Sequence, residues 1–370
     1  MAKHLALFIP SLGGGGAERV ILTIAGGLME KGHRVDLVVA SAGGVYQSEI
    51  PNGVRLVDLG SRRQIPLVLK LRDYLRSSEP DALLATPYRF NLTAVWAGFL
   101  ARGKTRIGVR EATFFPAKLR DARSRRHLLK KRVISLLARP TYSAADSIIA
   151  VSGGVSAALA EHFRIPEGRI SVISNPIDVE RTRQLAREGP GLSEDSPQSP
   201  LIVAAGRLTE QKDFQMLVRA FHRIVQELPR ARLCILGEGP LRADLESQIT
   251  AAGLDERVLL PGFLRNPFPV LASGSCFALS SRWEGFPNVL LQALALGKPI
   301  VATDCPSGPS EILGGGRWGR LVPVGDDVSL AGGIVEAVSR PSQHDRLVAR
   351  AREFDVDSIT DLYLEALQLQ

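Results

Sequence analysis

Two cations follow a candidate buried strand in the second half of the chain. Arg207 and Lys212 come directly after the apolar run Leu201–Ala205, and a helical pattern begins at Phe214. An arginine fork and a lysine ammonium placed together can hold a diphosphate. A solvated pair that caps a loop is the alternative. Because ligands bind at the carboxyl ends of strands in open α/β sheets, the position of the two cations favours an anion site.

An acid stands in front of a helix farther along the chain. An apolar run ends at Leu279, Glu284 begins the loop, and Pro287 suits the first turn of the helix that follows. Backbone amides around Gly285–Asn288 could meet phosphate oxygens, and Gln292 lies farther along the helix. An acid here often caps the helix. The strand-end position of Glu284 instead favours contact with a sugar hydroxyl.

A run of glycines, Gly13–Gly16, follows the first apolar run and precedes a helical pattern. Glycines let backbone amides approach a ligand, and a helix start favours anions. The spacing does not match the three-glycine dinucleotide pattern, and no acid follows the second apolar run, so a nicotinamide site is not favoured. We expect this glycine loop to contact a phosphate or a sugar; a flexible turn is the alternative.

The elements that must position these loops are short apolar runs that alternate with helical patterns. Runs without polar alternation suit parallel strands buried on both faces, so the sequence predicts a doubly wound α/β architecture. The expected strands are Leu5–Ile9, Val35–Val39, Val54–Leu59, Ala82–Ala85, Arg106–Val109, Ser147–Val151, Ile170–Ile173, Leu201–Ala205, Arg232–Leu236, Val258–Leu260, Cys276–Leu279, Pro299–Ala302 and Arg320–Val324.

The segment Gly189–Pro200 is rich in turn formers and has no periodicity, so we interpret it as a linker. It would separate an N-terminal domain, 1–190, from a C-terminal domain, 191–355. A terminal helix would occupy 356–370.

The composition is that of an ordinary globular chain. Hydrophobic residues make up 45% of the 370 residues and charged residues 23%, which excludes disorder as the main state. Three cysteines without metal-type spacing indicate reduced thiols in a cytosolic protein. Residues 1–190 carry 29 Lys and Arg against 16 Asp and Glu, and residues 191–370 carry 17 against 22. The two halves therefore suit different partners, but the basic half lacks the interleaved aromatics of nucleic-acid binding.

Several motifs in this order together resemble one known family. They are Gly13–Arg19, Val151–Val155, Asn175–Asp178, Gly206–Leu208, Leu236–Pro240, Pro261–Phe263 and Ser281–Leu291. The chain resembles the retaining glycosyltransferases of family 4, of the bacterial surface-polysaccharide type. The resemblance implies the GT-B fold: two Rossmann-like doubly wound domains that face each other across a cleft, with the last helix crossing back to the N-terminal domain.

The resemblance also implies a donor site, residue by residue. Arg207 and Lys212 would clamp the donor diphosphate and, with Glu284, form the catalytic set. Pro261–Phe263 would lie beside the nucleobase. The donor-binding residues would be Gly15, Gly16, Gly206, Gly262, Phe263, Gly285, Phe286, Pro287, Asn288 and Gln292.

Two positions depart from the family's pattern. Gln292 stands where the family usually has a Glu that contacts the ribose; an amide can still donate and accept hydrogen bonds, without the charge. The first domain also lacks the His that contacts the donor sugar in many members. Arg110 or Glu111 would take that place, and Ser152 is a further candidate on the acceptor side.

The implied reaction is transfer of a sugar, with retention, from a nucleotide diphosphate to a lipid-linked glycan. The donor would be a UDP-hexose or UDP-N-acetylhexosamine, from the likeness of Cys305–Pro309 to such members, with GDP-mannose left open. Protein cations and helix amides would stabilise the leaving diphosphate, so neither a metal nor a cofactor is expected. Asp355 and Asp357 could form a metal-binding pair, but they begin the final helix, where capping is favoured. A nucleotide-sugar 2-epimerase of the same fold and a non-catalytic binding protein are the alternatives.

A basic segment spans residues 118–139, with nine cations and one acid. Apolar residues recur in it at helical spacing, which predicts a basic helix that docks on an anionic membrane surface; a core helix with solvated charges is the alternative. We accordingly expect a cytoplasmic protein that is bound to the inner face of the cytoplasmic membrane. The docking cations would be Lys118, Arg120, Arg123, Arg125, Arg126, Lys130, Lys131 and Arg132.

Overall fold

The computed structural model describes residues 1–114, 139–189, 191–192, 199–340 and 343–369. It forms two compact units: an N-terminal unit of Met1–Pro176 with Val356–Gln370, and a C-terminal unit of Ile177–Asp355. The docking cations expected between Lys118 and Arg132 lie outside the described residues. In the part of the chain that is described, no helix is long and apolar enough to span a bilayer.

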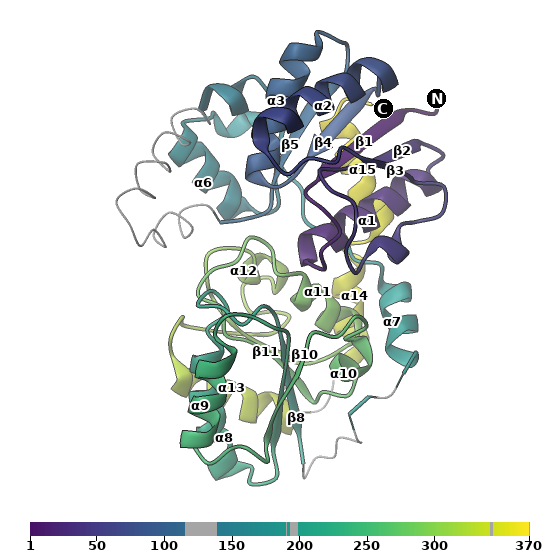
Figure 1. The fold of residues 1–370 in the computed structure, drawn as a ribbon. Helices are drawn as coiled ribbons and strands as arrows, with labels where there is room; N and C mark the ends of the chain where they lie inside the picture. The colour runs from purple at the N-terminus through teal and green to yellow at the C-terminus, as the bar shows by residue number, and fades with distance from the viewer. Residues whose placement is uncertain (115–138, 190, 193–198, 341–342, 370) are drawn as a thin grey trace. The chain divides into compact units, whose positions relative to one another are not determined.

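The N-terminal unit is built on one parallel sheet with the order β3-β2-β1-β4-β5-β6-β7 (Figure 1). The chain moves outward from β1 to β3 and then crosses to β4 on the other side of β1. The strand order therefore reverses between β1 and β4, which is where such sheets bind ligands. The strands are β1 (His4–Ile9), β2 (Arg34–Val39), β3 (Arg55–Asp58), β4 (Ala82–Ala85), β5 (Arg106–Glu111), β6 (Ser147–Ala150) and β7 (Ile170–Val172).

The α-helices of this unit with both ends described are α1 (Gly16–Glu30), α2 (Gln64–Ser78), α3 (Tyr88–Ala101), α6 (Gly153–Phe163) and α15 (Val356–Ala366). Val20, Ile21, Ile24 and Leu28 of α1 are buried along one face. The terminal helix α15 lies beside α1 (Figure 1). A Cβ at Gly27 would come within 2.5 Å of Thr360, so glycine is what lets these two helices approach.

The C-terminal unit repeats the plan with the order β10-β9-β8-β11-β12-β13, all parallel. Here the strand order reverses between β8 and β11. Its strands are β8 (Leu201–Ala205), β9 (Arg232–Leu236), β10 (Val258–Gly262), β11 (Cys276–Leu279), β12 (Ile300–Thr303) and β13 (Arg320–Val322). Its helices are α7 (Val179–Arg187), α8 (Phe214–Glu227), α9 (Arg242–Ala251), α10 (Phe268–Ala272), α11 (Asn288–Ala295), α12 (Pro309–Ile312), α13 (Asp327–Ser339) and α14 (His344–Arg352).

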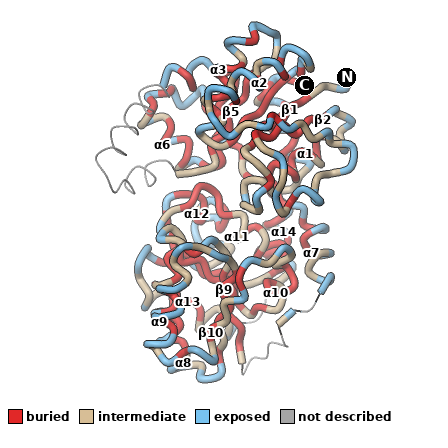
Figure 2. Tube along the Cα trace, viewed as in Figure 1, coloured by how far each residue is buried: buried red, intermediate tan, exposed pale blue. Residues whose placement is uncertain are grey.

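Burial follows this layering, with buried strands at the centre of each unit (Figure 2). Helix α8 shows how the sequence achieves it. Phe214, Leu217, Phe221 and Ile224 are buried in the core of the C-terminal unit, whereas Arg219, His222, Arg223 and Gln226 face solvent. This alternation at helical period is the ordinary pattern of a surface helix.

The division between the units falls at Pro176, earlier than the boundary expected at residue 190. Helix α7 packs on α10, α11 and α14 of the C-terminal unit. Just before it, the Ile177 amide donates to the Phe354 carbonyl at 2.8 Å, beside the point where the chain leaves this unit. The turn-rich segment after residue 189 therefore lies inside the C-terminal unit and does not separate the two.

Candidate functional site

The loops after β8 and β11 meet where the strand order of the C-terminal unit reverses. The Arg282 amide, after β11, donates to the Gln211 carbonyl, after β8, at 2.8 Å. The Ser280 hydroxyl donates to the Lys212 carbonyl at 2.7 Å. Segments separated by some seventy residues in the sequence are thereby fixed side by side, and they carry the expected catalytic set.

Lys212 and Glu284 form an ion pair, with 2.5 Å between Nζ and Oε1, and both side chains are largely buried, at 15% and 8% exposed. The Ser281 hydroxyl also donates to Oε1 at 2.6 Å. Gln211 reaches Oε2 at 3.4 Å, so this oxygen keeps most of its capacity to accept. Glu284 does not cap α11, whose N-cap is Pro287 without a side-chain hydrogen bond. The carboxylate therefore anchors Lys212 at the strand end.

Arg207 is exposed at the start of the same loop. Within the described residues its guanidinium forms no hydrogen bond or ion pair. It thus presents an unneutralised charge close in sequence to Lys212, which suits an anionic ligand.

Gly206 shapes the place of Lys212. A Cβ at this position would lie 2.8 Å from Lys212 Cε, so any side chain would displace the lysine stem. Gly237, at φ +135°, packs in turn against the Gly206 carbonyl. Gly206 is therefore a positioning residue for Lys212, beyond the donor contact that the resemblance implies.

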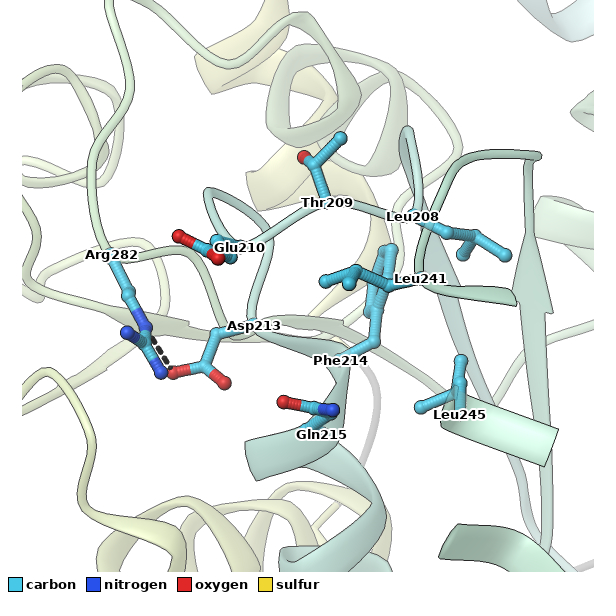
Figure 3. Close-up of a pocket in the computed structure, with 9 residues that line it drawn as sticks. All are labelled: Leu208, Thr209, Glu210, Asp213, Phe214, Gln215, Leu241, Leu245 and Arg282. Carbon is cyan, nitrogen blue, oxygen red and sulfur yellow. Dashed lines mark hydrogen bonds and ion pairs between the residues drawn. The ribbon is translucent and has the colours of Figure 1, made fainter. Parts of the chain in front are cut away.

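A second ion pair, which the sequence analysis missed, joins the loop after β11 to the N-terminus of α8. Arg282 Nε donates to Asp213 Oδ2 at 2.7 Å, and Asp213 also caps α8 through the Met216 amide at 3.3 Å. The pair lies in a small pocket together with Thr209 and Glu210 (Figure 3). Asp213 directly follows Lys212 and precedes an apolar helical pattern, an N-cap signal that was available in the sequence.

The loop 284–288 is interlocked with the loop after β12. The Glu284 amide donates to the Pro306 carbonyl at 2.8 Å, and the Ser307 amide donates back to the Glu284 carbonyl at 2.9 Å. Gly308, at φ +99°, leaves no room for a Cβ, which would lie 2.8 Å from Pro287. These contacts set the direction in which α11 begins at Asn288.

Two expected donor-binding residues of this loop region differ in what their side chains do. The Phe286 ring is buried and packs edge-on against Phe354, with ring centroids 5.8 Å apart, so only its backbone could face a ligand. Gln292 is half-buried on α11, and its amide group has no hydrogen-bond partner within the described residues. Gln292 can therefore accept or donate to a ligand.

The expected nucleobase contact lies at the carboxyl end of β10. Gly262 has φ +85°, its carbonyl accepts from the Gly237 amide at 2.8 Å, and a Cβ would lie 2.7 Å from Glu238. Phe263 next to it is 46% exposed. An exposed ring on a constrained turn offers a stacking surface.

Burial, and to a smaller extent the nearby Glu284 carboxylate, raises the pKa of the Cys305 thiol to about 12. All three cysteines are buried and unpaired. Cys305 is therefore a neutral thiol beside the site and not a nucleophile.

The backbone directly before the glycine loop of the N-terminal unit packs closely against the loop after β2. Gly44, at φ +128°, lies so close to the Leu12 carbonyl that a Cβ would be 2.1 Å away. Gly15 is the N-cap of α1, and a Cβ there would collide with the Glu18 carboxylate at 2.3 Å. Glu18 thus lies close to the amides that an anion would need. This placement favours a sugar hydroxyl over a phosphate as the partner of Gly15 and Gly16.

The acceptor-side expectation for Arg110 needs correction. Arg110 is fully buried; its guanidinium donates to the Tyr363 hydroxyl at 2.8 Å and to Asn175. It holds β5, α15 and the chain before α7 together, so its role is structural.

Glu111 and Ser152 are also engaged inside the N-terminal unit. Glu111 accepts from the Tyr142 hydroxyl at 3.1 Å; burial and then this carboxylate raise the pKa of Tyr142 well above its usual value. Ser152 is buried and caps α6 by accepting from the Val155 amide at 3.2 Å. Both side chains support local structure at the ends of β5 and β6.

No cluster of ligating side chains that could hold a metal ion occurs in the described ranges. Asp357 lies in the first turn of α15 and pairs with Lys31 of α1, as Asp361 does at 2.8 Å. Of Asp355 and Asp357, it is thus Asp357 that contributes to the packing of α15 against α1.

Two family models match the chain. The model described as Glycosyltransferase Family 4 matches residues 14–181, and the model described as Glycosyl transferases group 1 matches residues 199–340.

A curated relative from Campylobacter jejuni is 32% identical over 367 residues, 95% of this chain and 96% of the relative. It is named N-acetylgalactosamine-N,N'-diacetylbacillosaminyl-diphospho-undecaprenol 4-alpha-N-acetylgalactosaminyltransferase. A relative from Rhizobium meliloti is 27% identical over 95% of this chain and 96% of its own length. It is named lipopolysaccharide core biosynthesis glycosyltransferase LpsE.

Among solved structures, HepE from Anabaena in complex with UDP and glucose is similar over 100% of both chains, with a TM-score of 0.78 at 22% identity. This likeness confirms the GT-B fold expected from the sequence. The matched models and the full-length relative from Campylobacter show that the chain is a glycosyltransferase that belongs to family 4.

Proposed function

We propose that this enzyme transfers a hexose or N-acetylhexosamine from its UDP derivative to a lipid-linked glycan, with retention and without a metal ion. The Campylobacter relative is named for transfer of N-acetylgalactosamine to a glycan on diphospho-undecaprenol, and the Rhizobium relative for lipopolysaccharide core biosynthesis. These names support the sugar class and the acceptor class. GDP-mannose stays the second candidate donor.

The observation that carries the proposal is the arrangement of Arg207 and Lys212 at the carboxyl end of β8. One cation is unneutralised and exposed, and the other is held in place by Glu284. An arginine fork and a lysine ammonium in one loop can form charge-assisted hydrogen bonds to both phosphates of a diphosphate. Their charge could replace that of a metal ion, which is why we propose metal independence.

The chemistry follows from this pair. As the bond between the sugar's anomeric carbon and the diphosphate oxygen breaks, negative charge grows on the diphosphate and positive charge on the sugar ring. Arg207 and Lys212 stabilise the growing negative charge. The acceptor hydroxyl then bonds to the anomeric carbon from the face that the diphosphate leaves, and its proton passes to the departing phosphate oxygen.

Glu284 has two tasks in this scheme. Its Oε1 keeps the Lys212 ammonium at the strand end, together with Ser281. Its Oε2, which has only the long contact to Gln211, accepts a hydrogen bond from a donor sugar hydroxyl. In the same scheme Gln292 contacts the ribose and the Phe263 ring stacks on the base.

We further propose a peripheral location on the inner face of the cytoplasmic membrane, where a lipid-linked acceptor would be met. The nine cations between residues 118 and 139 support it, because basic segments bind anionic leaflets.

The test begins with thermal shift or calorimetry against UDP, GDP and ADP, followed by transfer assays with and without excess chelator. We expect UDP alone to bind tightly and transfer to survive chelation. Loss of transfer in chelator, restored by Mn²⁺ or Mg²⁺, would overturn metal independence.

The epimerase alternative has no support among the relatives described above, which are named as transferases. A donor incubated without acceptor checks this, and we expect no conversion of the donor sugar to its 2-epimer.

A further inference from the structure

Helix α3 of the N-terminal unit has an apolar outer face. Phe99 is 72% exposed, Trp96 48% and Leu100 38%. The Trp96 and Phe99 rings touch edge-on, with centroids 6.2 Å apart, so they form one continuous surface. On α8, by contrast, Arg219, His222 and Arg223 take the outer positions.

The inner face of α3 is already occupied. Phe90 packs against Phe8 with ring centroids 5.2 Å apart, and a Cβ at Gly98 would lie 2.6 Å from Ile107 of β5. The helix therefore has what it needs to fold on the sheet. A helix that is apolar on both faces needs a second apolar environment.

Helix α2 extends the apolar face. It packs beside α3, with Thr93 donating to Gln64 at 2.8 Å and Arg76 donating to the Leu100 carbonyl at 2.9 Å (Figure 1). Ile65 is 78% exposed and Leu69 42%. These two residues recur with Arg76 at a helical spacing that places them on the side toward α3. The face formed by Ile65, Leu69, Trp96, Phe99 and Leu100 is named the α2–α3 face below.

Exposed cations lie at the ends of α2 and α3, α3 itself carries no acidic residue, and the exposed Asp73 of α2 is paired with Arg72. Arg63, Arg89, Arg102 and Lys104 are exposed, and within the described residues their charged groups form no hydrogen bond or ion pair. An apolar, aromatic centre with a basic border matches the interface of an anionic bilayer, where rings enter among the acyl chains and cations meet headgroup phosphates. It matches a second copy of the chain poorly, because the two basic borders would meet.

We infer that the α2–α3 face docks on an anionic lipid surface. This face is separate from the basic segment at residues 118–139. Its side chains insert among the lipid acyl chains, whereas the basic segment offers charge to the headgroups. The docking would bring the enzyme to a lipid-linked acceptor, and in this respect the inference rests on the proposed function.

Vesicle co-sedimentation with the full chain tests the docking, using phosphatidylcholine vesicles with and without phosphatidylglycerol. We expect binding to the anionic vesicles and a loss of about tenfold or more in the variant Trp96→Gln with Phe99→Gln, because two rings no longer leave water. Val328→Gln is the matched control, since Val328 is 59% exposed on α13 of the other unit. Equal binding by wild type and the double variant would overturn the inference.

Fluorescence locates the contact. Brominated acyl chains quench an indole only at close range, so we expect quenching of wild type and its loss in Trp96→Phe, with vesicle binding retained. Unchanged quenching in Trp96→Phe would assign the contact to Trp283 or Trp318 and overturn the inference. A lipid-free dimer that Trp96→Gln with Phe99→Gln dissociates would overturn it too, in favour of a second copy.

Transfer to a water-soluble acceptor analogue, measured in parallel, keeps this inference separate from the proposed function. We expect wild-type rates for the double variant in that assay. Absence of transfer in wild type would count against the proposed function and leave the docking result intact.

Discussion

At the scale of single residues, Arg207 and Lys212 differ in what surrounds them. Removing Arg207 takes away an exposed, unneutralised charge, whereas removing Lys212 leaves the Glu284 carboxylate buried without its partner. We therefore expect Arg207→Ala and Lys212→Ala each to lower kcat by roughly 10²–10³, the usual scale for a preorganised charge. Only Lys212→Ala should also lower the free energy of unfolding, by about 1–3 kcal/mol.

Turnover at saturating donor and denaturant unfolding measure the two effects. Arg230→Ala is the matched control, an exposed arginine outside the loops of the site. Lys212→Ala combined with Glu284→Gln should recover part of the stability and none of the turnover. Wild-type turnover in Arg207→Ala would remove that residue from the donor site.

Gln292 offers a second test at this scale. If its amide meets the ribose, Gln292→Leu leaves a hydroxyl pair unsatisfied and weakens UDP binding by about 1–3 kcal/mol. Gln292→Glu should be tolerated, because the carboxylate can accept from both hydroxyls. Calorimetry with UDP checks both variants. An unchanged Kd in Gln292→Leu would show that the residue points elsewhere.

The sequence singled out Lys212 and Glu284 because each follows a recognisable strand, and the structure brings the two together as an ion pair. Their roles at a donor site stay a prediction. Arg110 was misjudged because a charged residue near a strand end looks like a ligand contact. Its partners, Tyr363 and Asn175, come from distant segments, and no local pattern announces them.

At the scale of elements, Asp36 ties the N-terminal unit together. It is fully buried on β2 and accepts from His4 of β1 at 2.9 Å, from Arg55 of β3 at 2.9 Å, and from Tyr74 of α2 at 2.7 Å. Burial alone would raise the pKa of Asp36, but these hydrogen bonds outweigh it and hold the pKa below its usual range.

A depressed native pKa makes this contribution pH-dependent. The stabilisation is present above the unfolded pKa, about 3.9, and is lost as the pH falls through the lower native value. We expect Asp36→Asn to lower stability at neutral pH and to flatten the fall in stability below about pH 4. Asp73→Asn, an exposed carboxylate on α2, is the control. Denaturant unfolding monitored by Trp96, with Trp283 and Trp318 changed to Phe, reports on this unit; an unaltered acid limb in Asp36→Asn would contradict the assignment.

The strands were the most predictable elements. Each expected apolar run corresponds to a strand of the structure, because a parallel strand buried on both faces leaves an uninterrupted apolar run such as Leu201–Ala205. The domain boundary was less predictable. Turn formers at 189–200 predicted a linker, but whether α7 before them packs on one unit or the other depends on contacts with α10 and α14 that the sequence does not display.

At the scale of the whole molecule, the two units divide the chemistry. The C-terminal unit carries Arg207, Lys212 and Glu284, and the N-terminal unit carries most of the positive charge and the α2–α3 face. We propose that the C-terminal unit binds the anionic donor and that the N-terminal unit receives the lipid-bound acceptor. The charge asymmetry was evident in the sequence; the α2–α3 face was not, because α3 is apolar enough to be taken for a core helix.

The central claim is that Arg207 and Lys212 bind the diphosphate of the donor. Calorimetry with UDP and with uridine, in the presence of chelator, isolates that contribution, because the two ligands differ only in the diphosphate. We predict that wild type binds UDP at least about 100-fold more tightly than uridine, and that this ratio collapses in Arg207→Ala with Lys212→Ala while uridine binding is unchanged. Equal affinities for the two ligands in wild type, or an undiminished ratio in the double variant, would contradict the account.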